Sequence, residues 1–166
     1  AIIPYGVGVD IGCRMALSVY DLPASHYIEH YDSLKDILMR NTKFGAGHGF
    51  HGQYKAEHRI MDDAKFETNS FIKNLKDKAW SQLGSSGGGN HFVEFGLKEF
   101  EKDDKALNVP KGTYLALLTH SGARGFGATV ADHYTRLAKD VCKLPYKAKN
   151  LAYLDLDSEE GQEYWI

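Results

Sequence analysis

The sequence predicts a mixed α+β domain, in which strands that carry polar side chains converge on one cleft while helices pack outside. Apolar runs with β propensity recur at residues 15–22, 91–95 and 113–119, and such runs indicate strands. Apolar residues return at helical spacing over 33–40 and 130–141, as expected for helices with one buried face. Glycine-rich stretches separate the two kinds of segment, and the chain's 166 residues suffice for one compact domain.

The first part of the chain predicts two strands in succession. Residues 2–9 combine β-branched residues with glycines, which predicts a short buried strand that ends at Asp10. Residues 15–22 alternate loosely between apolar and smaller or polar side chains and predict a second strand. Cys13 is therefore expected to lie between two strands.

A predominantly helical region follows. Residues 33–40 predict a short helix, with Asp32 or Ser33 available as its N-cap. Glycine occupies nearly every second position of 44–52, which predicts a loop. The pattern over 53–80 is mostly helical.

The second half predicts strands that alternate with loops. A glycine and serine run at 84–90 leads into the strand predicted at 91–95, and such glycines allow the backbone to approach a ligand closely. The mixed charges of 98–105 predict a solvated loop. The strand at 113–119 runs into a glycine turn at 120–127.

Two helices are predicted after that turn. The amphipathic pattern at 130–141 ends before Pro145. Residues 157–160 resemble a capping box that begins another helix.

Charge and cysteine usage narrow the classes of protein. A net charge of -2 gives no global positive field of the kind that attracts nucleic acid. The charge does not exclude a local basic patch on the folded protein. Cys13 and Cys142 are far apart in sequence and predict no disulfide framework, which favours a reducing cytoplasm. No apolar run approaches the roughly 20 residues that cross a bilayer, so no membrane association is expected.

Three polar clusters each combine a predicted strand end with neighbouring glycines. They are Asp10 with Cys13, Asn90 with His91 and Glu94, and His120 with Arg124. A carboxylate, a thiolate and two imidazoles form a plausible ligand set for a divalent ion such as zinc, manganese or cobalt. Taken singly, the cysteine also suits a small core position, the histidines suit structural hydrogen bonds, and the aspartate suits a turn.

Two other motifs give weaker evidence for a functional site. His48, His51 and His58 suggest another metal site, but they lack a nearby thiolate or carboxylate of obvious role, and display on a glycine-rich loop is the preferred interpretation. The run at 84–90 is neither a Walker loop nor a dinucleotide fingerprint. Phosphate contact through its backbone amides stays open.

Three segments resemble the signature segments of the RtcB RNA ligase family, in the same order. They are Gly8–Cys13, Gly89–Glu94 and His120–Gly125. The resemblance extends loosely over nearly the whole chain, while members of that family are considerably longer. It implies that residues 1–166 are the N-terminal part of an RtcB-like catalytic domain, with mixed sheets and peripheral helices around a metal and nucleotide cleft.

The resemblance also implies an activity. Family members are GTP-dependent, manganese-using enzymes that join RNA ends bearing a 3′-phosphate or 2′,3′-cyclic phosphate to 5′-hydroxyl ends, after a histidine has been guanylylated. That histidine, and a further metal-binding one, would lie outside this chain. On the matching positions, Asp10, Cys13 and His91 would hold one manganese ion, Cys13 and His120 a second, Asn90 and Glu94 the guanine nucleotide, and Arg124 an RNA or nucleotide phosphate.

Two departures from the family pattern suggest altered RNA contacts. Arg14 stands where many relatives have glycine, and Ala123 occupies a position that is often serine. Two other functions stay open at this point. One is a noncatalytic module that binds metal or RNA phosphate, and the other is a metal-dependent phosphoesterase that uses the same ligands to activate water.

Overall fold

The computed structural model describes residues 1–166 and has the predicted α+β composition, with its elements divided between two compact units. The helical unit comprises Ala1–Cys13, Gly47–Leu83 and Gly122–Ile166. The sheet unit comprises Arg14–Ala46 and Gly84–Ser121. Each unit is therefore assembled from segments that are far apart in sequence.

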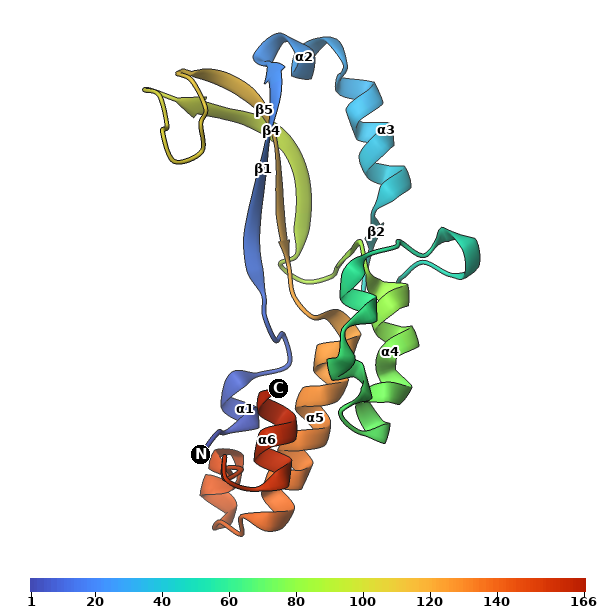
Figure 1. Cartoon of the computed structure of the whole chain (residues 1–166), viewed down its shortest axis with the longest axis vertical. Coiled ribbons are helices and arrows are strands. Elements are labelled where there is room, and N and C mark those ends of the chain that lie inside the picture. Colours follow the sequence, from blue (N-terminus) through green and yellow to red (C-terminus); the bar gives the residue numbers. More distant parts are fainter. The chain divides into compact units, whose positions relative to one another are not determined.

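A three-stranded antiparallel sheet forms the centre of the sheet unit (Figure 1). Its order is β1-β5-β4, with β1 at Arg14–Pro23, β4 at Phe92–Phe100 and β5 at Gly112–Ser121. All three predicted central strands are confirmed. β4 continues to Phe100, so the first residues of the predicted charged loop at 98–105 belong to a strand.

Two helices follow β1 in the sheet unit. They are α2 at Ala24–Glu29 and α3 at Tyr31–Asn41, which buries Leu34. α3 confirms the helix predicted at 33–40. The helix begins at Tyr31, two residues before Ser33, and its N-cap residue is His30 rather than the predicted Asp32 or Ser33. No side chain caps the helix.

A short parallel pair completes this unit. β2 at Lys43–Phe44 pairs with β3 at Ser85–Gly87. The predicted loop at 84–90 therefore contains a strand, all three residues of which are buried. Small side chains allow this burial, since serine and glycine leave room for the neighbouring backbone.

Helices dominate the other unit. α4 spans Ser70–Gln82, α5 spans Arg124–Val141 and α6 spans Glu159–Trp165. The core of this unit is a cluster of Tyr134, Ala138, Ala152 and Leu154, none of which is more than 3% exposed. Ala138 on α5 and Ala152 after the last 3₁₀ turn are small, which allows the segments of this core to pack closely.

In the region predicted to be helical at 53–80, only the part from Ser70 onward is α-helix. Three 3₁₀ turns, at Gly52–Tyr54, Arg59–Asp62 and Ala64–Glu67, precede α4. Side chains of His58 and Asp63 accept hydrogen bonds from backbone amides two residues later. Such bonds take backbone amides that a continuous helix would use, so a new short 3₁₀ turn begins after each of these side chains.

The strand predicted at residues 2–9 is wrong. The structure has the helical turn α1 at Pro4–Val7, and only Ile2 forms a β-bridge, with Leu154. Proline has a backbone angle suited to the first position of a helix, and Gly8 ends the turn with a φ of 84°. Cys13 therefore follows a loop and a helical turn rather than a strand.

The helix predicted to begin at 157–160 is confirmed as α6, but its N-cap is Ser158 and the residue three positions later is Gly161, so the reciprocal bond of a capping box does not form. The Ser158 hydroxyl accepts a hydrogen bond of 3.1 Å from the Gly161 amide. No helix in the structure is long and apolar enough to cross a membrane. The cytoplasmic location expected from the cysteines stays a prediction.

Candidate metal centre

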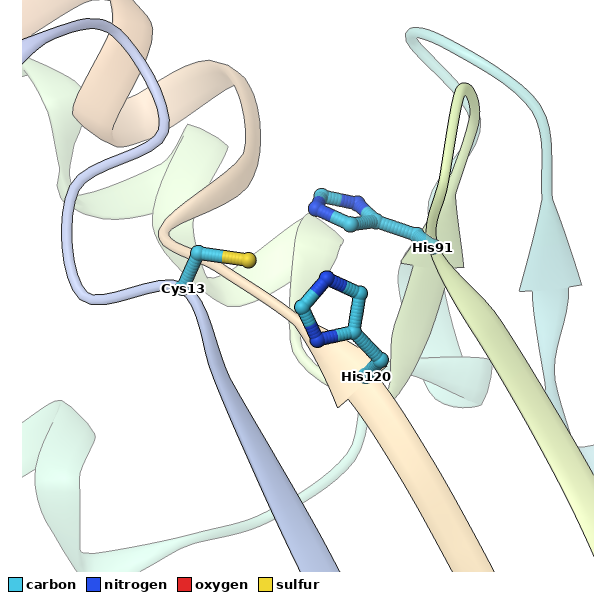
Figure 2. Close-up of side chains that lie close together, drawn as sticks. All are labelled: Cys13, His91 and His120. Atoms are coloured by element: carbon cyan, nitrogen blue, oxygen red, sulfur yellow. The ribbon is translucent and has the colours of Figure 1, made fainter.

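Cys13, His91 and His120 lie close together at one end of the three-stranded sheet. One donor atom from each side chain lies within 4.8 Å of the donor atoms of the other two (Figure 2). All three residues are partly buried. Their sequence separation is large, so this grouping is a product of the fold.

Strand pairing explains how these residues meet. Cys13 directly precedes β1, whose first residue, Arg14, pairs with Ser121 at the end of β5. His91 directly precedes β4, whose first residue, Phe92, pairs with His120. The thiol and the two rings are therefore delivered to the same end of the sheet by three adjacent strands.

The donor set fits a divalent transition metal. Metal–sulfur and metal–nitrogen bonds are about 2.0–2.3 Å long, so donors that share one ion lie roughly 3–4 Å apart. Small side-chain rotations would bring the three groups to that spacing. Thiolate and imidazole ligands suit borderline metals, and an added carboxylate makes the set more suitable for manganese.

Asp10 is the fourth predicted ligand. It lies outside the group of three donors and contacts it through a hydrogen bond with the Cys13 side chain. A side-chain hydrogen bond to Asp10 is the main reason that the pKa of the Cys13 thiol is raised, followed by desolvation and by the negative charge of the same carboxylate. The Cys13 amide also donates to the Asp10 carbonyl at 3.2 Å. A metal ion would have to replace the thiol proton, so its affinity should fall as pH falls.

A glycine turn supports the loop that carries Asp10. The Ala123 amide donates to the Ile11 carbonyl at 2.9 Å. A Cβ at Gly122 would overlap a carboxylate oxygen of Asp10. Only glycine leaves room for the carboxylate at this point of the turn.

Asn90 and Glu94 are the predicted nucleotide-binding residues; Asn90 lies in the turn before β4, and Glu94 lies in β4. The Asn90 amide nitrogen is 3.3 Å from Nε2 of His120. Glu94 pairs with Leu118, two positions from His120 along β5, so the Glu94 and His120 side chains point to the same face. Glu94 is exposed there and is accessible to a ligand.

Arg124, the predicted phosphate-binding residue, is the first residue of α5. Its backbone has a φ of 56°, in the left-handed region that residues other than glycine rarely adopt. Strained backbone at a surface turn is a feature of functional sites. The next residue, Gly125, has no side chain, and the space that a Cβ would take there is bordered by the Gln82 side-chain amide.

Comparison with known proteins identifies the family. A family model described as "tRNA-splicing ligase RtcB" matches residues 1–166. The chain belongs to the RtcB family.

Curated RtcB relatives match most of this chain at modest identity. The tRNA-splicing ligase RtcB of Nanoarchaeum equitans is 26% identical over 98% of the chain, which corresponds to 40% of that protein. That of Pyrococcus furiosus is 28% identical over 82% of the chain and 15% of its own length. An Escherichia coli protein named RNA-splicing ligase RtcB1 is 29% identical over 99% of the chain and 40% of its own length. The chain thus spans two fifths or less of these RtcB relatives.

Sequence reasoning missed one buried polar residue that contacts the start of α5 in this RtcB-family chain. Gln82, the last residue of α4, is only 8% exposed, and its side chain accepts a hydrogen bond from the Phe126 amide. A signal was available, because Gln82 continues the spacing of Ile72, Leu75 and Ala79 along the partly buried face of α4. A polar side chain on such a face indicates a specific hydrogen-bond partner.

The histidines at 48, 51 and 58 are not part of the metal cluster. His58 Nδ1 accepts the Ile60 amide at 3.1 Å and caps a 3₁₀ turn. His58 therefore has a structural role at this turn.

Proposed function

We propose that the protein carrying this chain is a GTP- and manganese-dependent RNA ligase. It joins RNA ends that bear a 3′-phosphate or a 2′,3′-cyclic phosphate to 5′-hydroxyl ends. Residues 1–166 form the N-terminal part of its catalytic domain, and the histidine that becomes guanylylated lies outside them. The observation that carries this proposal is the grouping of Cys13, His91 and His120 in a chain of the RtcB family.

The proposed metal site holds two manganese ions. Asp10, Cys13 and His91 would hold one ion, and Cys13 and His120 would contribute to holding the second. The negative charge of the Cys13 thiolate would offset part of the positive charge of the bound ions. When bound, the metal polarises phosphoryl oxygens and offsets the charge that develops at phosphorus.

Protein side chains around the metals orient the reacting groups. The Asn90 amide, 3.3 Å from the His120 ring, fixes the orientation of that ring. Asn90 and Glu94 bind the guanine nucleotide on the face of the sheet that His120 occupies. Arg124 supplies a bidentate contact to an RNA or nucleotide phosphate.

A substitution at Cys13 tests the metal assignment. Cys13→Ala removes the ligand shared by both ions, and we expect manganese affinity to fall by about a hundredfold or more, since loss of a residue that only supports a ligand already costs roughly 10–100-fold. Isothermal titration calorimetry with manganese measures the change. The matched control is Cys142→Ala, which removes the chain's other thiol, away from the cluster, and should leave the affinity unchanged.

Unchanged manganese affinity in Cys13→Ala would contradict the site. Mass spectrometry of the full-length protein after incubation with GTP and manganese then tests the reaction. A covalent GMP adduct supports the ligase. Release of phosphate from 3′-phosphorylated RNA without GTP supports the phosphoesterase, and metal binding with neither reaction supports the noncatalytic module.

A further inference from the structure

Helix α5 begins without a capping side chain of its own. Its N-cap residue, Ala123, has no side chain that accepts a hydrogen bond, although the first amides of a helix have no partner inside it. The Phe126 amide donates instead to the side-chain oxygen of Gln82, at 3.1 Å and from 44 residues away in sequence. The cap is therefore supplied by another helix, α4.

The Gln82 side chain also lies against the backbone next to Arg124. A Cβ placed on Gly125 would come within 3.0 and 3.1 Å of the amide nitrogen and oxygen of Gln82. Gln82 is 8% exposed, so its amide has little freedom to move. Contact and hydrogen bond together fix the path of Gly125 and Phe126.

Arg124 needs such support because its own backbone is unfavourable. A φ of 56° persists for an arginine only where the surrounding structure holds it. The Ala123 amide is bound to the Ile11 carbonyl on the N-terminal side. Gln82 holds the C-terminal side through the Phe126 amide.

We propose that Gln82 is a positioning residue for phosphate recognition by Arg124. This inference rests on the proposed function, which assigns the RNA phosphate to Arg124. Gln82 touches no substrate and acts through the backbone of residues 125–126. It holds the arginine in the one backbone conformation from which the guanidinium is aimed.

A double-mutant cycle in the full-length protein tests this role. Gln82→Met keeps the length of the side chain but removes the hydrogen-bond acceptor. The binding of a short single-stranded RNA with a 3′-phosphate is measured by fluorescence anisotropy, with the same RNA ending in a 3′-hydroxyl as reference. We expect Gln82→Met to weaken binding of the phosphorylated RNA about tenfold, which matches the loss of one helix cap.

The second arm of the cycle separates positioning from stability. In an Arg124→Ala background, Gln82→Met should cause no further loss, because the group that it positions is gone. Gln82→Glu keeps an acceptor oxygen and should restore binding to within about twofold of wild type. An equal loss from Gln82→Met in both backgrounds, or no loss in either, would overturn the proposal.

A second variant reaches the same contact without changing Gln82. Gly125→Ala places a methyl group against the Gln82 amide, and it should also weaken binding of the phosphorylated RNA while Arg124 is present. If Gln82→Met does not fold, this variant decides between the same two outcomes. A failure of the proposed function looks different, because wild-type protein would then show no preference for the 3′-phosphate, and both proposals would fall.

Discussion

Arg124 is the residue at which the proposed chemistry and the backbone strain coincide. The side chain is the proposed phosphate ligand, and the backbone has a φ of 56°. A left-handed conformation costs a residue with a Cβ roughly 1–2 kcal/mol relative to glycine. Stability alone would therefore favour glycine here.

Two substitutions of Arg124 separate these contributions. Arg124→Ala and Arg124→Gly both remove the guanidinium, but only glycine relieves the strain. We expect Arg124→Gly to be more stable than Arg124→Ala by about 1 kcal/mol, the reverse of the order at an ordinary helix position. Chemical denaturation measures the difference, and both variants should lose binding of 3′-phosphorylated RNA equally.

The opposite order of stability would show that the backbone at residue 124 is not strained in solution. Unequal RNA binding by the two variants would show that backbone freedom, beyond the guanidinium, sets the affinity.

The candidate metal ligands could be predicted from the sequence, but the residue that holds the backbone beside Arg124 could not. Cys13, His91 and His120 stand out because thiol and imidazole groups beside glycines suggest ligands, and the structure groups all three. Gln82 does not stand out, because its partner is a backbone amide 44 residues away. Nothing in the sequence around Phe126 indicates that its amide binds Gln82.

At the scale of elements, Tyr134 joins three helices through its hydroxyl group. Asn69, the N-cap of α4, donates to that hydroxyl at 3.2 Å, and the hydroxyl donates to the Glu163 carboxylate on α6 at 3.1 Å. Burial is the main reason that the pKa of Tyr134 rises to about 12. The hydrogen bond from Asn69 lowers the pKa, and the Glu163 carboxylate raises it further. The phenol is therefore neutral in the folded protein well above its usual pKa.

This network predicts how stability depends on pH. Because the pKa is higher in the folded state than the usual value near 10, the contribution of Tyr134 is fully present below pH 10 and is lost as pH rises from 10 toward 12. Tyr134→Phe should lower the free energy of unfolding by about 1 kcal/mol at pH 8. The variant should also lose less stability than wild type between pH 8 and pH 11.5, as measured by urea unfolding at each pH.

The neighbouring Tyr164 provides the control. Its hydroxyl is buried without a hydrogen-bond partner, so Tyr164→Phe should be neutral or stabilising at pH 8. Equal destabilisation by the two substitutions would contradict the role given to the Asn69–Tyr134–Glu163 network.

Predictability of the elements follows the length of their patterns. The strands β1 and β5 and the helices α3 and α5 each show an apolar pattern over many residues, and all four were predicted from sequence. α5 nevertheless begins at Arg124, inside the glycine turn predicted at 120–127. Short elements depend on single residues. Pro4 converts a β-branched stretch into the turn α1, and the side chains of His58 and Asp63 interrupt the helix predicted over 53–80.

At the scale of the whole molecule, this chain is expected to hold the metal ligands but not the nucleophile. In the proposed mechanism the guanylylated histidine lies outside residues 1–166, and the chain spans 40% of its Nanoarchaeum equitans relative. We therefore expect residues 1–166 made alone to form no covalent GMP adduct and to join no RNA. Incubation with radiolabelled GTP and manganese, followed by denaturing electrophoresis, measures this, with the full-length protein as the positive control.

A labelled band from the isolated chain would contradict that expectation. It would mean that one of the eight histidines in the chain accepts GMP. Replacing each in turn would then identify it.

The pairing of His120 with Met15 on one side and Phe92 on the other has a consequence for mutation. Side chains along a strand alternate between faces, so sliding β5 by a single position would turn the His120 ring to the opposite side of the sheet while every ligand remained in the sequence. Deleting one residue between Leu115 and Thr119 should therefore abolish metal binding as thoroughly as removing a ligand. Insertions among residues 101–111, at the far end of the β4–β5 hairpin, leave that alignment intact.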